Sequence, residues 1–203
     1  EIKSPPGSVK VLDNGNCFLT RDLNTLNNII TSNKTLSGKE PLELGEQVWT
    51  RGKIISLMIN NLDIKTIPRS IEKLNGLTKL HLQNNNITTL PENICNLNLN
   101  TEKIHTFLAG NNYLCEKIPD CVEYLPGFNY EYDHNGYPIY EPQNCIVCEP
   151  GFKGIVHISD NTTVVDKKNC FYKSDLNGLQ NIINVNQNFS GLEPLEIGHQ
   201  TWD

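Results

Sequence analysis

The sequence predicts an α/β solenoid, a fold in which short repeats stack in layers. First, an apolar pattern occurs three times between residues 54 and 125, at a spacing of about 23 residues. Second, each copy joins an alternating, strand-like stretch to one with apolar residues three apart, which suits a short helical turn. Third, the segment from Cys17 to Trp49 recurs as Cys170 to Trp202. One copy cannot bury its own apolar side, so the copies are expected to stack.

The middle copy carries the clearest pattern. Residues 77–97 read LxxLxLxxNxIxxLPxxIxxL, with a strand-like part at Leu80-His81-Leu82 and a helical part from Pro91 to Leu97. The same apolar set recurs in the first and third copies as Ile54, Leu57, Ile59, Ile64, Ile67, Ile71 and Leu74, and as Ile104, Phe107, Ala109, Leu114, Ile118, Val122 and Leu125. The pattern resembles leucine-rich repeats, with copies at 54–76, 77–99 and 100–125.

This resemblance implies roles for particular side chains. Asn85 and Asn112 stand where the family has an inward asparagine that satisfies backbone groups at a bend. Strand side chains that point away from the core would form a concave face, the usual partner surface of the family. Three strands about 4.8 Å apart make this face only about 15 Å tall, so solvated surface is the simpler interpretation. The candidate contact residues are Met58, Lys79, His81, Gln83 and Leu108.

The flanking segments are predicted to cap or link the stack. Residues 1–16 would end a preceding linker. Residues 17–53 contain a helical pattern starting near Asp22, then Trp49, and resemble the N-terminal cap of extracellular leucine-rich-repeat proteins. Within the tyrosine- and cysteine-rich linker at 126–169, aromatic residues flank Asn135-Gly136 and predict a β-hairpin. That hairpin is more simply a cap over the last repeat than a binding platform.

The second half of this segment is predicted to be a disulfide-stapled linker. The run from Cys145 to Gly154 reads CxxCxPGFxG and is similar to pieces of small extracellular modules of the growth-factor-like kind. A redox CxxC would precede a helix, which Pro150-Gly151 disfavours. A zinc site would need a second close cysteine pair, which the sequence lacks.

A longer repeat organises the whole chain. Cys17–Trp49 and Cys170–Trp202 share 19 of 33 aligned residues at an offset of 153. The chain therefore reads as one complete unit, Cys17 to Asn169, followed by the cap of the next unit at 170–203. Because that second cap has no repeats after it, we expect the chain to be a window on a longer tandem array.

Cysteines and glycosylation sequons predict an extracellular, secreted protein. One unit holds six cysteines, which suggests three disulfides per unit, and Cys95 with Cys121 and Cys148 with Cys170 are hypothetical pairs. The predicted disulfide cysteines are Cys17, Cys95, Cys115, Cys121, Cys145, Cys148 and Cys170. The predicted N-glycan sites are Asn33, Asn86, Asn161 and Asn188.

Several function classes are disfavoured. The net charge is −6 without a Lys/Arg cluster, which argues against nucleic-acid binding. No apolar run approaches the roughly 20 residues of a membrane span. The sequence shows no signal peptide and starts at Glu1 rather than Met, so a mature or excised segment is expected. The five histidines are scattered without metal-ligand spacing, and no phosphate-binding glycine loop occurs. We therefore predict no catalytic residues, no metal and no cofactor.

Two functions remain. The first is a secreted structural protein whose units assemble head to tail, with other copies of itself, into a glycosylated fibre or surface array. The alternative is an ectodomain for adhesion or recognition, with a protein or glycan partner on the concave face. The sequence leaves open the partner, the length of the parent protein, the remaining disulfide pairing, the occupied sequons and the source organism.

Overall fold

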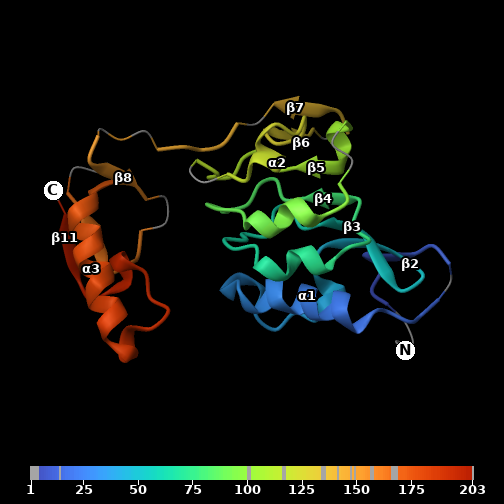
Figure 1. Ribbon diagram of the computed structural model, residues 1–203, viewed down its shortest axis with the longest axis horizontal. Helices are drawn as coiled ribbons and strands as arrows, with labels where there is room; N and C mark the ends of the chain where they lie inside the picture. The colour runs from blue at the N-terminus through green and yellow to red at the C-terminus, as the bar shows by residue number, and fades with distance from the viewer. Residues whose placement is uncertain are drawn as a thin grey trace. The chain divides into compact units, whose positions relative to one another are not determined.

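The chain is a mixed α/β protein that falls into two compact units, residues 1–144 and 145–203. The computed structural model describes residues 5–13, 15–99, 102–115, 118–133, 136–140, 142–146, 148, 150–155, 158–165 and 169–202. The boundary between the units lies within residues 126–169, the segment predicted to be a linker. Figure 1 shows the elements of both units, and each unit is described by itself.

The first unit is built on a five-stranded mixed sheet in the order β1-β2-β3-β4-β5. The strands are β1 (Val9–Val11), β2 (Glu46–Thr50), β3 (Lys53–Met58), β4 (Lys79–His81) and β5 (Phe107–Leu108). β2 and β3 are antiparallel, whereas β3, β4 and β5 run parallel. The register pairs Leu57 with Leu80, so residues 23 positions apart in the sequence lie side by side.

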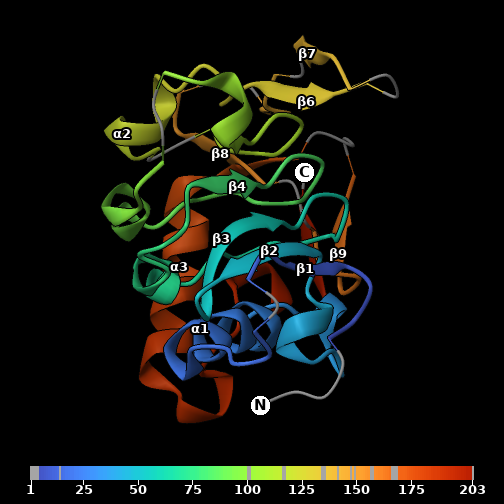
Figure 2. The ribbon, with the colours of Figure 1, turned by 90° about the vertical axis from the view of Figure 1, so that its right-hand side faces the viewer.

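Helical segments connect the strands. They are α1 (Thr20–Thr31), η1 (Lys34–Leu36), η2 (Pro41–Glu43), η3 (Arg69–Lys73), η4 (Glu92–Asn96), η5 (Ile104–Thr106) and α2 (Asp120–Glu123). Pro68, Pro91 and Pro119 each stand in extended conformation directly before η3, η4 and α2. Proline fixes φ near −65° and has no N–H to leave unpaired, so it suits the start of such a turn. In Figures 1 and 2, α1, η3 and η4 follow one another in layers beside the strands.

Alternating strand residues and one side of each turn form a continuous core. Trp49, Ile54, Leu57, Leu80 and Leu82 are fully buried within it. The predicted apolar positions of the first two copies all belong to this cluster. In the third copy, Ile118 is half-buried against the cluster, and the side chain of Ile104 lies outside the described residues.

Two buried asparagines satisfy the backbone at the bends, as the sequence predicts. Asn85 Oδ1 accepts hydrogen bonds from the N–H groups of Leu62 and Ile64, both at 3.0 Å. Asn85 Nδ2 donates to the carbonyl oxygens of Ile59 and Leu82, both at 2.8 Å. Asn112 repeats the arrangement one layer further on, where its Oδ1 accepts from the N–H of Ile87 at 3.0 Å. A buried polar side chain is stable only when it is hydrogen-bonded, and both residues meet that condition.

The unit ends with the predicted hairpin. β6 (Tyr130–Tyr132) and β7 (Pro138–Tyr140) pair antiparallel, and the Tyr130 and Tyr140 rings meet edge to face at 5.6 Å. Asn135 of the expected turn lies outside the described residues, whereas Gly136 adopts a φ of 80°. The Gly110 N–H donates to Tyr130 O at 3.1 Å, so the hairpin lies beside the last strand of the sheet.

The second unit reproduces the start of the first. Its elements are β8 (Phe152–Gly154), β9 (Thr162–Val164), β10 (Cys170–Tyr172), α3 (Lys173–Val185), η6 (Gln187–Phe189), η7 (Pro194–Glu196) and β11 (Gln200–Trp202). β9 pairs with β11 in the register that β1 has with β2, shifted by 153 positions. Phe18 meets Trp49 edge to face at 4.9 Å, and Phe171 meets Trp202 in the same way at 5.1 Å. The sequence repeat is therefore also a structural repeat.

Candidate functional site

The predicted contact residues lie on one side of the three parallel strands. The register places Met58, His81 and Leu108 in one row, and Ser56 beside Lys79 in the next. Gln83 lies two residues beyond His81. We call these six residues the strand face. Met58 and Lys79 are half-buried, whereas His81, Gln83 and Leu108 are buried, so this surface is less open than the sequence suggests.

The strand face has little charge and unused hydrogen-bonding capacity. Ser56 Oγ and Gln83 Oε1 are buried, and neither has a hydrogen-bond partner among the described residues. His81 Nε2 lies 3.1 Å from the carbonyl oxygen of His105, and burial lowers the pKa of His81 to about 4, so its ring is neutral at pH 7. Lys79 therefore supplies the charge of this face. Such a surface can accept hydrogen bonds from a partner.

A second polar surface was not predicted. A groove of about 390 Å³ is lined by Asn61, Asp63, Asn84, Asn85, Asn86, Asn111, Tyr113 and Asn144. Asn61, Asn84 and Asn111 all adopt left-handed backbone conformations, which asparagine tolerates better than most residues. Asn111 Nδ2 donates to Asn84 Oδ1 at 2.7 Å, and Asn144 Nδ2 donates to Asn111 Oδ1 at 2.5 Å. Asn84, Asn111 and Asn144 thus form a ladder of amides along the bends.

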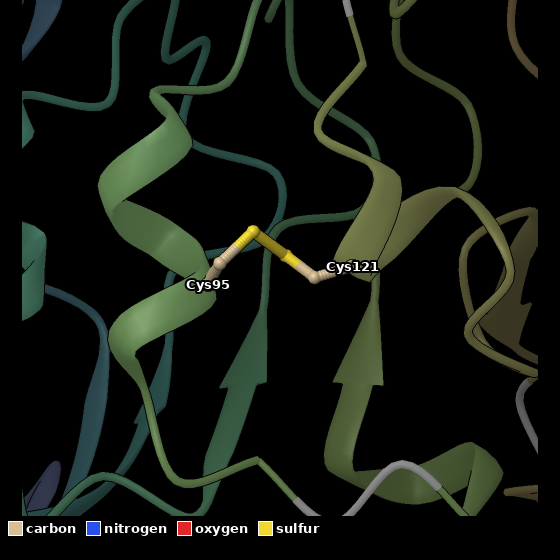
Figure 3. Close-up of a disulfide and its surroundings, with 2 residues drawn as sticks. All are labelled: Cys95 and Cys121. Atoms are coloured by element: carbon tan, nitrogen blue, oxygen red, sulfur yellow. A yellow bond between two sulfur atoms is a disulfide. The ribbon is translucent and has the colours of Figure 1, made fainter.

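The disulfides match the two pairs suggested by the sequence. Cys95 in η4 is bonded to Cys121 in α2 (Figure 3), and Cys148 is bonded to Cys170. Cys115 and Cys145 are also disulfide-bonded. Cys17 is free and exposed within this chain, so its predicted disulfide stays a prediction. Three disulfides indicate an oxidising compartment and suggest an extracellular protein.

The four sequons have different surroundings. Asn161 and Asn188 are exposed and offer room for a glycan. Asn86 is half-buried and donates to the Asp63 carboxylate. Asn33 is buried, and its Nδ2 donates to the carbonyl oxygens of Ile29 at 2.8 Å and Thr66 at 2.9 Å. A glycan on Nδ2 would displace one of these bonds, so the geometry disfavours Asn33 as a glycan site.

The two caps differ in what covers their helix. In the first unit, residues 53–74 lie over α1: Asp22 Oδ2 accepts from the Ile54 N–H at 3.2 Å, and Asn33 Oδ1 accepts from the N–H groups of Lys65 and Thr66 at 2.8 and 3.0 Å. Ile29 of α1 is 0 % exposed, whereas its counterpart Ile182 of α3 is 46 % exposed. The counterparts of Asp22 and Asn33, Asp175 and Asn186, are exposed as well. We call this side of α3 the uncovered cap face.

Neither a candidate metal cluster nor a candidate membrane span occurs in the described part of the chain. Among those residues, no group of three His, Cys, Asp or Glu side chains is arranged to hold a metal ion. Nor does any helix there have the length and apolar character to cross a membrane. Comparison with protein-family models, with curated proteins and with solved structures gives no match for this chain.

Proposed function

We propose that this chain belongs to a non-enzymatic, secreted structural protein in which tandem leucine-rich-repeat units assemble head to tail into a glycosylated fibre or surface array. The repeat assignment is supported by the parallel pairing of residues 23 positions apart, by a proline-started turn in each layer, and by the buried asparagines at the bends. A solenoid of this kind buries its apolar sides by stacking, and its ends need a cap.

The uncovered cap face of α3 carries the proposal. It has the same sequence pattern as α1, yet Ile182 is exposed where Ile29 is buried. Exposing a large apolar side chain forgoes roughly 1.5–3 kcal/mol of burial. A further unit of the same construction would supply a segment like residues 53–74 and cover this face. Repeated along one direction, such contacts produce an open filament rather than a closed ring.

Negative-stain electron microscopy of the native material tests this function. A compact unit of 153 residues should be about 40 Å across, from the size scaling of folded chains. Filaments or sheets with an axial repeat of that order, labelled by an antibody against residues 17–144, are the expected result. Labelling confined to discrete, separate particles would refute the array.

A second candidate function is recognition of a protein or glycan by the strand face. It is favoured by the unpartnered Ser56 Oγ and Gln83 Oε1, because a buried acceptor without a partner costs about 1–3 kcal/mol that a ligand donor could recover. A screen against secreted proteins and glycans tests it. A ligand of this face should bind Lys79→Ala and Gln83→Ala at least about tenfold more weakly, a loss of about 1.4 kcal/mol. Lys173→Ala, in the second unit, is the matched control and should leave binding unchanged.

A further inference from the structure

The two copies of the cap differ at the segment before their helix. In the second copy, β10 pairs antiparallel with β8, Cys170 is bonded to Cys148, and Phe171 stands opposite Lys153. In the first copy, the equivalent residues 17–19 belong to no strand, and Cys17 is a free, exposed thiol. Among the described residues, the same sequence element thus has a partner strand in the second copy and none in the first.

Hydrogen bonds show which edge of the segment is open. The Leu19 N–H donates to Gly52 O at 2.8 Å, so one edge is occupied within the first unit. Backbone groups alternate between the two edges of an extended strand, so those of Asn16, Phe18 and Thr20 face the other way. Among the described residues, none bonds the backbone N–H or C=O of Phe18.

The same edge is the paired one in the second copy. There the Ile155 N–H donates to Asn169 O at 2.8 Å, and the Lys173 N–H donates to Gly151 O at 2.9 Å. Asn169, Phe171 and Lys173 are the counterparts of Asn16, Phe18 and Thr20 at the offset of 153. The open edge of the first copy is therefore formed by the residues that bind β8 in the second.

We infer that residues 16–20 are a docking edge for the linker strand of a neighbouring repeat unit, and that Cys17 forms a disulfide with the second cysteine of that linker's CxxC. The linker strand would resemble residues 148–154, with a cysteine, a Pro-Gly turn and a short strand. In the second copy, the Phe152 ring meets the Tyr172 ring at 5.2 Å. Leu19 is the counterpart of Tyr172, so the phenylalanine of the docked linker should lie against Leu19. Each joint between units is then covalent as well as hydrogen-bonded. The source of the linker rests on the tandem arrangement proposed above.

The disulfide forms by thiol–disulfide exchange. The Cys17 thiolate attacks a low-molecular-weight disulfide such as oxidised glutathione, one thiol leaves with a proton, and a mixed disulfide results. The linker thiolate then attacks the Cys17 sulfur of that mixed disulfide and expels the second thiol. Two protein thiols are oxidised and one small disulfide is reduced to two thiols, so electrons and protons balance.

A peptide probe tests the site on the intact chain. The probe has the sequence of residues 142–155 with Cys145→Ser, and its remaining cysteine is activated as a mixed disulfide with glutathione. A control peptide keeps the cysteine position but has the residues after it in scrambled order. Mass spectrometry should show attachment at Cys17 on the order of tenfold faster for the native strand, because docking raises the effective concentration of the reacting groups. Equal rates for the two peptides, or attachment elsewhere, would overturn the inference.

Thr20→Pro separates docking from simple thiol reactivity. Thr20 is the first residue of α1, where proline is tolerated, and Leu19 already has the extended conformation that a following proline requires. The substitution removes the N–H equivalent to that of Lys173. It should reduce the preference for the native peptide several-fold while leaving the rate with glutathione disulfide alone unchanged. An unchanged preference would argue against pairing at this edge.

The two proposals fail separately. Preferential attachment of the peptide to Cys17 in a protein that forms only discrete particles would keep the docking edge and refute the array. Filaments whose Cys17 shows no strand preference would keep the array and refute the docking edge.

Discussion

Asn33 and Asn186 show that one residue type at equivalent positions can have different roles. Asn33 makes two donor and two acceptor side-chain bonds, three of them to residues 65 and 66, whereas the side chain of the exposed Asn186 donates to Ile182 O within its own helix end. The two segments around them share 19 of 33 residues. The difference arises from the presence of residues 53–74 over one helix and not the other.

Replacing Asn33 by alanine should therefore destabilise the first unit by about 2–4 kcal/mol, because backbone groups of Lys65 and Thr66 lose buried partners. Asn186→Ala is the matched control and should change stability by less than about 0.5 kcal/mol. Urea denaturation measures both: Trp49 fluorescence in a Trp202→Phe background follows Asn33→Ala, and Trp202 fluorescence in a Trp49→Phe background follows Asn186→Ala. Similar losses for the two variants would contradict the assigned role of Asn33.

His81 makes a pH-dependent contribution. Burial lowers the pKa of His81 to about 4 in the fold, below the ordinary value of 6.5. The unfolded chain therefore takes up a proton at higher pH than the folded chain, and stability falls as the pH drops from 6.5 to about 4. The full effect is about 3 kcal/mol, at 1.36 kcal/mol per pKa unit.

His81→Gln removes this titration while keeping a side-chain N–H that can donate to His105 O. The unfolding free energy of the natural sequence should therefore fall more steeply than that of the variant over this pH interval. Parallel pH profiles of the two proteins would exclude His81 as the cause.

At the scale of elements, the Cys95–Cys121 disulfide joins two successive layers. It links η4 to α2 across a sequence separation of 26 residues, slightly more than the 23-residue offset between β3 and β4. A crosslink of that span lowers the conformational entropy of the unfolded chain. In the loop-entropy treatment it contributes about 3–4 kcal/mol to the free energy of unfolding. It lies beside the β5 end of the five-stranded sheet, in the segment where the apolar pattern is least regular.

Cys95→Ala/Cys121→Ala should lower the stability of the first unit by about that amount. Cys148→Ala/Cys170→Ala is the matched control, since that disulfide lies in the second unit and should leave the Trp49 transition unchanged. If the first double variant unfolded at the same urea concentration as the natural sequence, the disulfide would not be a support of the stack.

At the scale of the whole molecule, the helices of the two caps differ in how much of their apolar surface is buried. Leu26, Ile29 and Ile30 of α1 are at most 5 % exposed, whereas Ile182 and Val185 of α3 are 46 % and 80 % exposed. A helix with an unburied apolar side opens more readily than one packed in a core.

Amide hydrogen exchange should therefore be slower in α1 than in α3 by at least about tenfold. Appending a second copy of residues 51–144 after Asp203 should cover α3 and slow its exchange toward that of α1, which mass spectrometry can measure. Unchanged exchange in the extended chain would show that the uncovered cap face does not accept a repeat segment.

The sequence by itself determined the elements that local pattern encodes. Strand alternation, proline before each turn, the apolar core positions, the hairpin and the 153-residue repeat could all be identified from residue type and spacing. The roles of Asn85 and Asn112 came from the resemblance to leucine-rich repeats, and the two disulfide pairs were hypotheses. These features depend on residues close in the sequence or one repeat away, so they can be predicted from the spacing of residue types.

Only the tertiary structure decided which of these residues are covered. The burial of His81 and Gln83, the asparagine groove, the free Cys17 and the contrast between Asn33 and Asn186 depend on what packs against each residue from distant parts of the chain. Equivalent sequences can be buried or exposed because the segment that packs against a residue, and not the residue itself, sets its burial and its hydrogen bonds.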